Sequence, residues 1–96
     1  MKEYTVTSTI ANNPPMTFTG EMLAEVDSQR PSSDKYLIMR LYQTNKGKIV
    51  LESIGVGMEP DDFRSFKVFQ NVDAMMRRTE TTRMRTRLLA KAGLID

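Results

Sequence analysis

The stretch that decides the fold is KYLIMRLYQTNKGKIVLESIGV, residues 35–56, in which two largely apolar segments flank a short polar turn. The turn ends in Gly47, which can adopt the left-handed conformation that closes a hairpin. Apolar residues occupy both alternating faces of the first segment, as expected for a central strand with helices over one face of its sheet. One face carries Leu37, Met39 and Leu41, and the other carries Tyr36, Ile38, Arg40 and Tyr42.

The residues before this hairpin predict two further strands. In residues 4–11 the apolar side chains alternate with threonines, and the NNPP segment at residues 12–15 must end that strand. From residue 16 to residue 26 the apolar side chains take even positions, which predicts a second strand with one apolar face. That row consists of Met16, Phe18, Met22, Ala24 and Val26. Gly20 stands in the same row, where a bulge or bend is expected. Residues 27–34 are rich in turn formers and predict an exposed loop.

Residues 58–70 permit two interpretations. Pro60 is followed by two acidic residues, as in a first helical turn, and phenylalanines recur every three residues. However, residues 63–69 (FRSFKVF) are aromatic and β-branched, and Asn71 is a good N-cap for a helix that begins at Val72. We favour a fifth strand, with the short helix as the alternative.

After Asn71 the pattern is helical, but its apolar side chains point in two directions. At about 100° per residue, the apolar residues of 72–76 lie nearly opposite those of 84–92. One straight helix cannot bury both sets, so we expect a break at residues 79–82 (TETT), with Thr79 capping the second helix and Glu80 in its first turn. Gly93 fits a left-handed C-cap that returns Leu94 onto Leu89.

These patterns predict an α+β fold: an antiparallel β-meander of four or five strands followed by two short C-terminal helices packed on one face. The 96 residues suffice for a single domain, residues 1–96. Its strand region covers about residues 4–70 and its helical region about residues 71–93.

The composition excludes several classes of protein. The chain has no cysteine, so it has neither a disulfide framework nor a thiolate zinc site. Its start lacks the apolar run of a secretory leader, and its longest strongly apolar stretch, residues 36–39, is far short of the ~20 residues that span a bilayer. We therefore expect a cytoplasmic protein that does not associate with membranes.

The sequence offers little for catalysis, because the chain lacks both histidine and cysteine. The acidic cluster of Glu59, Asp61 and Asp62 is the one candidate for a magnesium site or an acid–base pair, and an enzyme built on it is a third hypothesis. Acids beside a proline are ordinary at a surface turn, and the GVG at residues 55–57 is too short for a phosphate loop. We expect no catalytic residue, metal or cofactor.

Charge is divided unequally along the chain. Residues 1–62 carry a net charge of −3, whereas residues 63–96 carry +5. The candidate partner-binding residues are all basic: Arg77, Arg78, Arg83, Arg85, Arg87 and Lys91. Arg83, Arg87 and Lys91 repeat every four residues and form one stripe, which a solvated helix face explains as well as a phosphate contact does. Lys46 and Lys48 extend this surface if the helices pack near the hairpin turn.

Arg85 is exceptional because its helical angle places it among apolar residues. Its stem can pass along the edge of the core, or that side of the helix is a protein contact patch.

We expect a small non-enzymatic protein that docks a protein partner through its basic Met/Leu/Arg helices, such as an accessory or inhibitor of a nucleic-acid-handling complex. The alternative is direct, weakly sequence-specific nucleic-acid binding through the same helices. The absence of aromatic residues in 72–96 weakens the alternative, since bases stack on aromatic side chains. The sequence does not indicate an oligomeric state.

Overall fold

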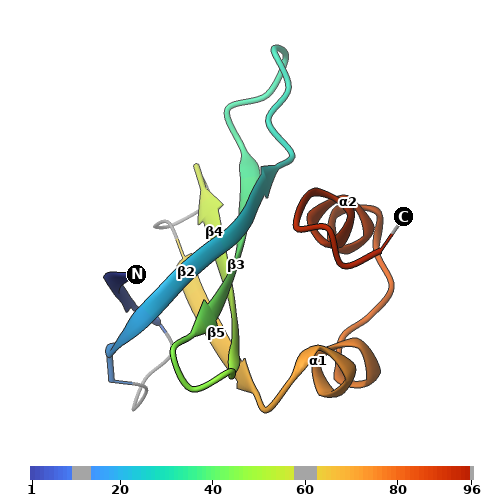
Figure 1. Ribbon diagram of the computed structural model, residues 1–96. Coiled ribbons are helices and arrows are strands. Elements are labelled where there is room, and N and C mark those ends of the chain that lie inside the picture. The colour runs from blue at the N-terminus through green and yellow to red at the C-terminus, as the bar shows by residue number, and fades with distance from the viewer. Residues whose placement is uncertain (10–13, 58–62, 96) are drawn as a thin grey trace.

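The structure is a computed structural model that describes residues 1–9, 14–57 and 63–95. Five antiparallel strands form one sheet in the order β1-β2-β3-β4-β5, and two helices lie on the same side of it (Figure 1). The strands are β1 Lys2–Val6, β2 Met16–Asp27, β3 Tyr36–Thr44, β4 Ile49–Val56 and β5 Phe63–Phe69. The helices are α1 Val72–Arg78 and α2 Arg83–Lys91. This meander with two C-terminal helices confirms the predicted fold class.

The hairpin of β3 and β4 forms as predicted and lies at the centre of the sheet. Gly47 has a φ of 82°, and its N–H donates a 2.9 Å hydrogen bond to the Thr44 carbonyl. The Thr44 hydroxyl accepts from the Lys46 and Lys48 amides at 3.3 and 3.1 Å. The left-handed glycine and these side-chain bonds set the register of the hairpin.

The predicted single apolar face of residues 16–26 is wrong, because β2 contains a register shift between Met22 and Ala24. The extra residue at this bulge reverses which side of the sheet the following side chains face. Met16 packs on one face of the sheet, whereas Ala24 packs on the other. Gly20 instead allows β2 and β3 to lie close together, since a Cβ there would lie 2.2 Å from the Gln43 carbonyl oxygen.

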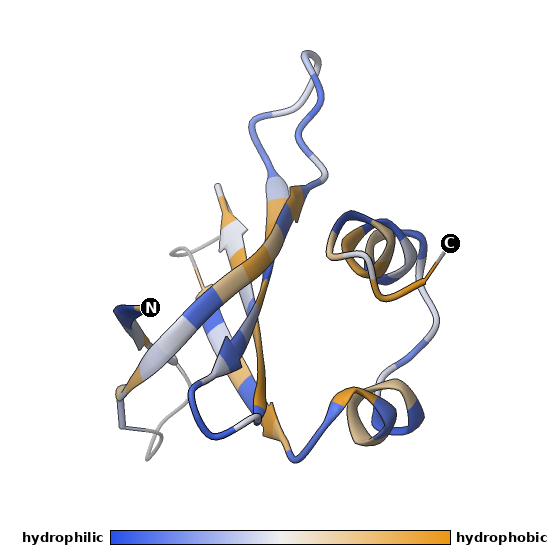
Figure 2. Cartoon of the chain, viewed as in Figure 1, coloured by the Kyte–Doolittle hydropathy of each residue, from blue (hydrophilic) through white to orange (hydrophobic). Residues whose placement is uncertain are grey.

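The sheet consequently has a core on each face, and hydrophobic residues alternate with hydrophilic ones along its strands (Figure 2). The larger core lies under the helices and comprises Ala24, Val26, Leu41, Ile49, Leu51, Phe69, Met75, Leu88 and Leu89. The smaller one lies inside the curl of the sheet and is centred on Val6, Tyr42 and Val50. The Thr9 amide closes this curl by donating a 2.9 Å hydrogen bond to the Arg64 carbonyl of β5.

The outer strands only partly match their predicted ranges. The strand predicted at residues 4–11 is observed at Lys2–Val6, and residues 10 and 11 lie outside the described part of the chain. The preference for a strand over a helix at residues 63–69 is confirmed, because β5 pairs with β4 along its whole length.

The predicted break between the two helices is confirmed, but the predicted cap of the second helix is wrong. Asn71 caps α1 by accepting a hydrogen bond from the Ala74 amide at 2.8 Å. Thr79 ends this helix, since its hydroxyl donates to the Met75 carbonyl at 2.7 Å. The N-cap of α2 is Thr82, whose hydroxyl accepts from the Arg85 amide at 3.1 Å. Glu80 therefore precedes α2 and is not in its first turn.

The C-terminal end of α2 has the predicted left-handed glycine, with a φ of 77° at Gly93. The Gly93 amide donates to the Ala90 carbonyl and the Leu94 amide donates to the Leu89 carbonyl, which is a Schellman motif. The Leu94 side chain remains 37% exposed, and Ile95 packs against the core beneath the helices.

Replacing Thr82 with alanine removes the N-cap of α2 and should lower the free energy of unfolding by about 1 kcal/mol. Thr81→Ala is the matched control, because Thr81 is exposed and does not cap either helix. Urea denaturation of both variants tests the assignment. Equal stability of the two variants would show that Thr82 is not the cap.

Candidate partner-binding surface

The six predicted contact residues divide into three groups by exposure and by hydrogen-bond partner. The groups are exposed Arg77, Arg78 and Arg83; exposed Arg87 and Lys91, which bind the backbone of β2; and buried Arg85. The first group is exposed to solvent, whereas the other two make contacts within the fold.

Arg85 is 8% exposed and binds the end of α1. Its Nη1 donates to the Met76 carbonyl at 3.2 Å, the Thr79 carbonyl at 3.1 Å and the Thr79 hydroxyl at 3.2 Å. Carbonyls at a helix C-terminus lack partners within the helix and form the negative end of its dipole, so a guanidinium is well suited to this place. The Arg85 Nε has no hydrogen-bond partner in the described chain. Arg85 thus joins the two helices and does not present its charge to solvent.

Arg87 and Lys91 cover an open edge of the sheet. In the described part of the chain β1 pairs only with the first five residues of β2, so residues 21–27 have a strand neighbour on one side. The Lys91 Nζ donates to the Glu25 carbonyl at 2.8 Å, and an Arg87 Nη1 donates to the Asp27 carbonyl at 3.2 Å.

The spacing of these contacts follows from backbone geometry. Four helical residues rise about 6 Å, close to the roughly 6.7 Å spanned by two strand residues, so cations at i and i+4 reach alternate carbonyls of an antiparallel strand. Covering an unpaired edge in this way is a common protection against unwanted strand pairing. Arg87 and Lys91, two members of the predicted basic stripe, therefore bind the backbone of β2. Arg83, the third member, does not bind β2.

A groove separates the helix-facing side of the sheet from the segment that joins the helices; we call it the interhelix groove. Its apolar half has a volume of about 400 Å³, with Leu37, Met39 and Leu51 on the strands and Met84 on α2. Its polar half has a volume of about 370 Å³ and includes Lys67 of β5. The two halves meet at Leu51, Thr79 and Glu80.

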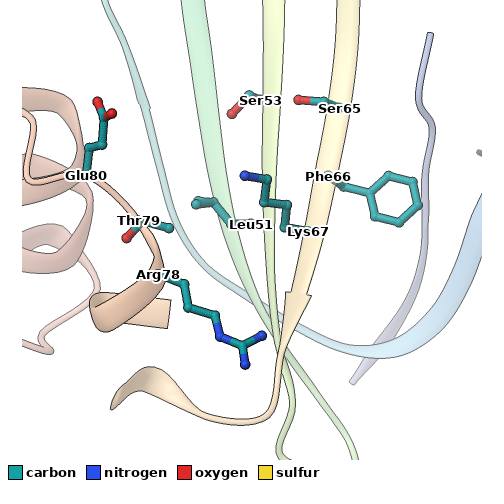
Figure 3. A pocket seen from close by; sticks show the side chains of 8 residues that line it. All are labelled: Leu51, Ser53, Ser65, Phe66, Lys67, Arg78, Thr79 and Glu80. Atoms are coloured by element: carbon teal, nitrogen blue, oxygen red, sulfur yellow. The ribbon is translucent and has the colours of Figure 1, made fainter. Parts of the chain in front are cut away.

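Figure 3 shows the polar half, where Ser53, Ser65 and Lys67 on the strands lie opposite Arg78 and Thr79 at the end of α1. The charges around the groove are mostly positive. Lys67, Arg78 and Arg83 are exposed, and Glu80 is the acidic residue among the described residues that line the groove. The groove therefore combines an apolar floor with a cationic rim.

A charged network on the opposite face of the sheet was missed by sequence reasoning. Glu52 is 2% exposed and accepts a 2.9 Å hydrogen bond from the Tyr42 hydroxyl. Arg40 lies between two carboxylates, with its Nε 2.6 Å from Glu25 and its Nη1 3.7 Å from Glu52. The signal in the sequence is that Glu52 is the one charged residue of the largely apolar strand IVLESIGV.

This network changes the pKa of two of its members. Burial, together with the hydrogen bond to Glu52, raises the pKa of Tyr42 to about 12. Burial lowers the pKa of Arg40, but the hydrogen bond and negative charge of Glu25 outweigh burial and leave it raised. Because Glu52 is buried within the curl of the sheet, we interpret the network as structural.

The carboxylate cluster considered for catalysis, Glu59, Asp61 and Asp62, lies outside the described residues. Within the described ranges, no group of three acidic residues is arranged to hold a metal ion. No helix in that part of the chain is long and apolar enough to cross a bilayer.

Comparison with protein families, curated proteins and solved structures finds no match to this chain. Its function must therefore be argued from the interhelix groove and the basic residues around it.

Substituting Arg85 with methionine retains an apolar stem but leaves the C-terminal carbonyls of α1 without a donor. The free energy of unfolding should fall by about 1–3 kcal/mol. Arg83→Met is the matched control on the exposed side of the same helix and should change stability by less than about 0.5 kcal/mol. If Arg85→Met is as stable as Arg83→Met, the guanidinium does not join the helices.

The raised pKa of Tyr42 predicts a loss of stability at alkaline pH. The folded state keeps the tyrosine proton up to about pH 12, whereas the unfolded chain releases it near pH 10, so the free energy of unfolding falls between these values. Tyr42→Phe should remove this part of the slope while costing about 1 kcal/mol at neutral pH through the lost hydrogen bond to Glu52. Urea unfolding at a series of pH values measures both effects. An unchanged alkaline slope in the variant would contradict the assignment.

Proposed function

We propose that this chain is a small non-catalytic binding protein that docks a protein partner over the interhelix groove. The observation that carries the proposal is an open apolar groove of about 400 Å³ next to exposed cations. Arginine, methionine and aromatic residues are enriched in protein interfaces, and methionine adapts its shape to a partner. The contacting cations are Arg77, Arg78 and Arg83, because Arg85, Arg87 and Lys91 are engaged within the fold.

The rim favours a partner with acidic side chains, since Lys67, Arg78 and Arg83 outnumber Glu80 in the described lining of the groove. An accessory or inhibitor of a nucleic-acid-handling complex is a specific form of this proposal. Such complexes present acidic catalytic surfaces or surfaces next to nucleic acid, and a positive rim suits either.

Direct binding of nucleic acid is the second candidate. It is favoured by the position of the β3–β4 hairpin, because the pairing of Ile49 with Phe69 places Lys46 and Lys48 at the same end of the sheet as α1 (Figure 1). It is weakened by the engagement of Arg87 and Lys91 with β2, which leaves fewer cations to neutralise phosphates.

The test is purification of the tagged chain from its native cells, with nuclease-treated and untreated samples compared. We expect a protein partner that remains after nuclease treatment. The triple variant Arg77→Glu, Arg78→Glu and Arg83→Glu should reduce its recovery about tenfold or more, a cost of about 1.4 kcal/mol.

The matched control reverses three exposed cations that do not line the groove: Lys2→Glu, Arg30→Glu and Lys35→Glu. This control variant changes the net charge by as much as the first triple variant does, and it should recover the partner as the wild type does. Loss of the partner on nuclease treatment would favour the nucleic-acid alternative. Equal loss with both triple variants, or recovery of no partner by the wild type, would contradict docking at the groove.

A further inference from the structure

Among the residues that the structure describes, the outer edge of β5 is partly unpaired, whereas the edge of β2 is covered by α2. One side of β5 pairs with β4 from Phe63 to Phe69. On the other side, Arg64 exchanges hydrogen bonds with Thr9 through its carbonyl and its amide. Because backbone groups alternate in an antiparallel strand, Phe66 and Val68 also direct their N–H and C=O groups outward. In the described ranges no segment pairs with these two residues on that side.

The sequence of this edge is suited to pairing with another strand. FRSFKVF contains aromatic and β-branched residues and no proline, and Val68 is 41% exposed. Proteins usually protect such an edge with a bulge, a proline, charge or a covering element. On β5 the sole protection within residues 65–69 is the charge of Lys67.

Two hollows beside β5 carry positive charge. The polar half of the interhelix groove places Lys67 and Arg78 beside Ser65 and Phe66. A second hollow of about 270 Å³ places Arg77 and Arg78 beside Val68. A strand added here would alternate its side chains between the two faces of the sheet, and those on the helix side would meet these cations.

We propose that β5 is a strand-addition site for an extended acidic segment of a protein partner. The segment pairs with the backbone of Phe66 and Val68, and its acidic side chains contact Lys67 and Arg78. Backbone hydrogen bonds supply affinity in this mode of recognition, and alternate side chains supply specificity. A second copy of β5 is disfavoured, since it would bring its own cations to the same place. This inference rests on the proposed function, because it specifies how the partner binds at that face.

The probe is a short, end-capped peptide in which glutamate alternates with valine, and its control replaces each glutamate with lysine. Amide hydrogen exchange followed by NMR should show new protection at Phe66 and Val68 when the glutamate peptide is present. The lysine peptide should bind at least tenfold more weakly. Absence of protection at these amides, or equal binding of the two peptides, would overturn the proposal.

Val68→Pro tests the backbone contact, because it removes an outward N–H while leaving the hydrogen bonds to β4 intact. It should weaken the glutamate peptide about tenfold. A glutamate peptide that is N-methylated at alternate residues tests the same contact on the wild-type protein, so the proposal does not depend on the folding of the variant. Wild-type affinity in both experiments would overturn it.

Lys67→Glu with Arg78→Glu tests the charge contact, and Lys2→Glu with Arg30→Glu is its matched control. The first pair should weaken the glutamate peptide about tenfold, and the second should not. If the two double variants weaken binding of the glutamate peptide equally, Lys67 and Arg78 have no specific role in binding it. If the protein dimerises with increasing concentration and Val68→Pro abolishes the dimer, a second copy of the chain pairs with β5. That result would overturn the proposal of an acidic partner segment.

The outcomes separate this inference from the proposed function. A cellular partner that is lost with the Arg77, Arg78 and Arg83 triple variant but retained with Val68→Pro supports docking and overturns strand addition. Strand addition by the glutamate peptide, with no partner recovered from cells, supports the site and overturns the proposed function.

Discussion

The register shift between Met22 and Ala24 is the constraint on which the rest of the structure depends. One extra residue lets a single strand contribute side chains first to the core inside the curl and then to the core beneath the helices. Beyond the shift, β2 has no strand on its outer side in the described chain, so its carbonyls face α2. Arg87 and Lys91 bind those carbonyls and place α2 along the edge. The position of the second helix, and with it one wall of the interhelix groove, follows from this irregularity.

The two edges of the sheet are consequently unequal. The edge of β2 is covered by basic side chains from α2, whereas no segment of residues 1–9, 14–57 or 63–95 pairs with the outer side of β5 at Phe66 and Val68. The short helix α1 follows the end of β5 and turns the chain back. Arg85 then fixes α2 against the last carbonyls of α1. The groove is therefore held open by a polar contact between two helices, with an apolar floor that neither helix fills.

Much of the fold could be predicted from the sequence, since strand alternation and helical angle report local structure directly. The β3–β4 hairpin and the break before α2 were found in this way. A bulge or bend in β2 was expected at Gly20, but the register shift lies between Met22 and Ala24. Its position could not be predicted, because apolar residues continue at every second position of the sequence through the shift. The cap of α2 was misplaced because Thr79 and Thr82 are chemically equivalent, and the tertiary contact of Arg85 distinguishes them. Of the candidate site, the sequence revealed the basic residues but not their acceptors, which lie on β2 and α1.

The central claim is that the six basic residues of the C-terminal helices have two separate roles. The most direct measurement replaces each of them singly with methionine and records, for each variant, both the free energy of unfolding and the recovery of the cellular partner. We expect variants at Arg85, Arg87 and Lys91 to lose stability and, where folded, to retain the partner. Variants at Arg77, Arg78 and Arg83 should keep their stability and lose the partner. Partner recovery that falls equally at all six positions, with stability unchanged, would contradict this division.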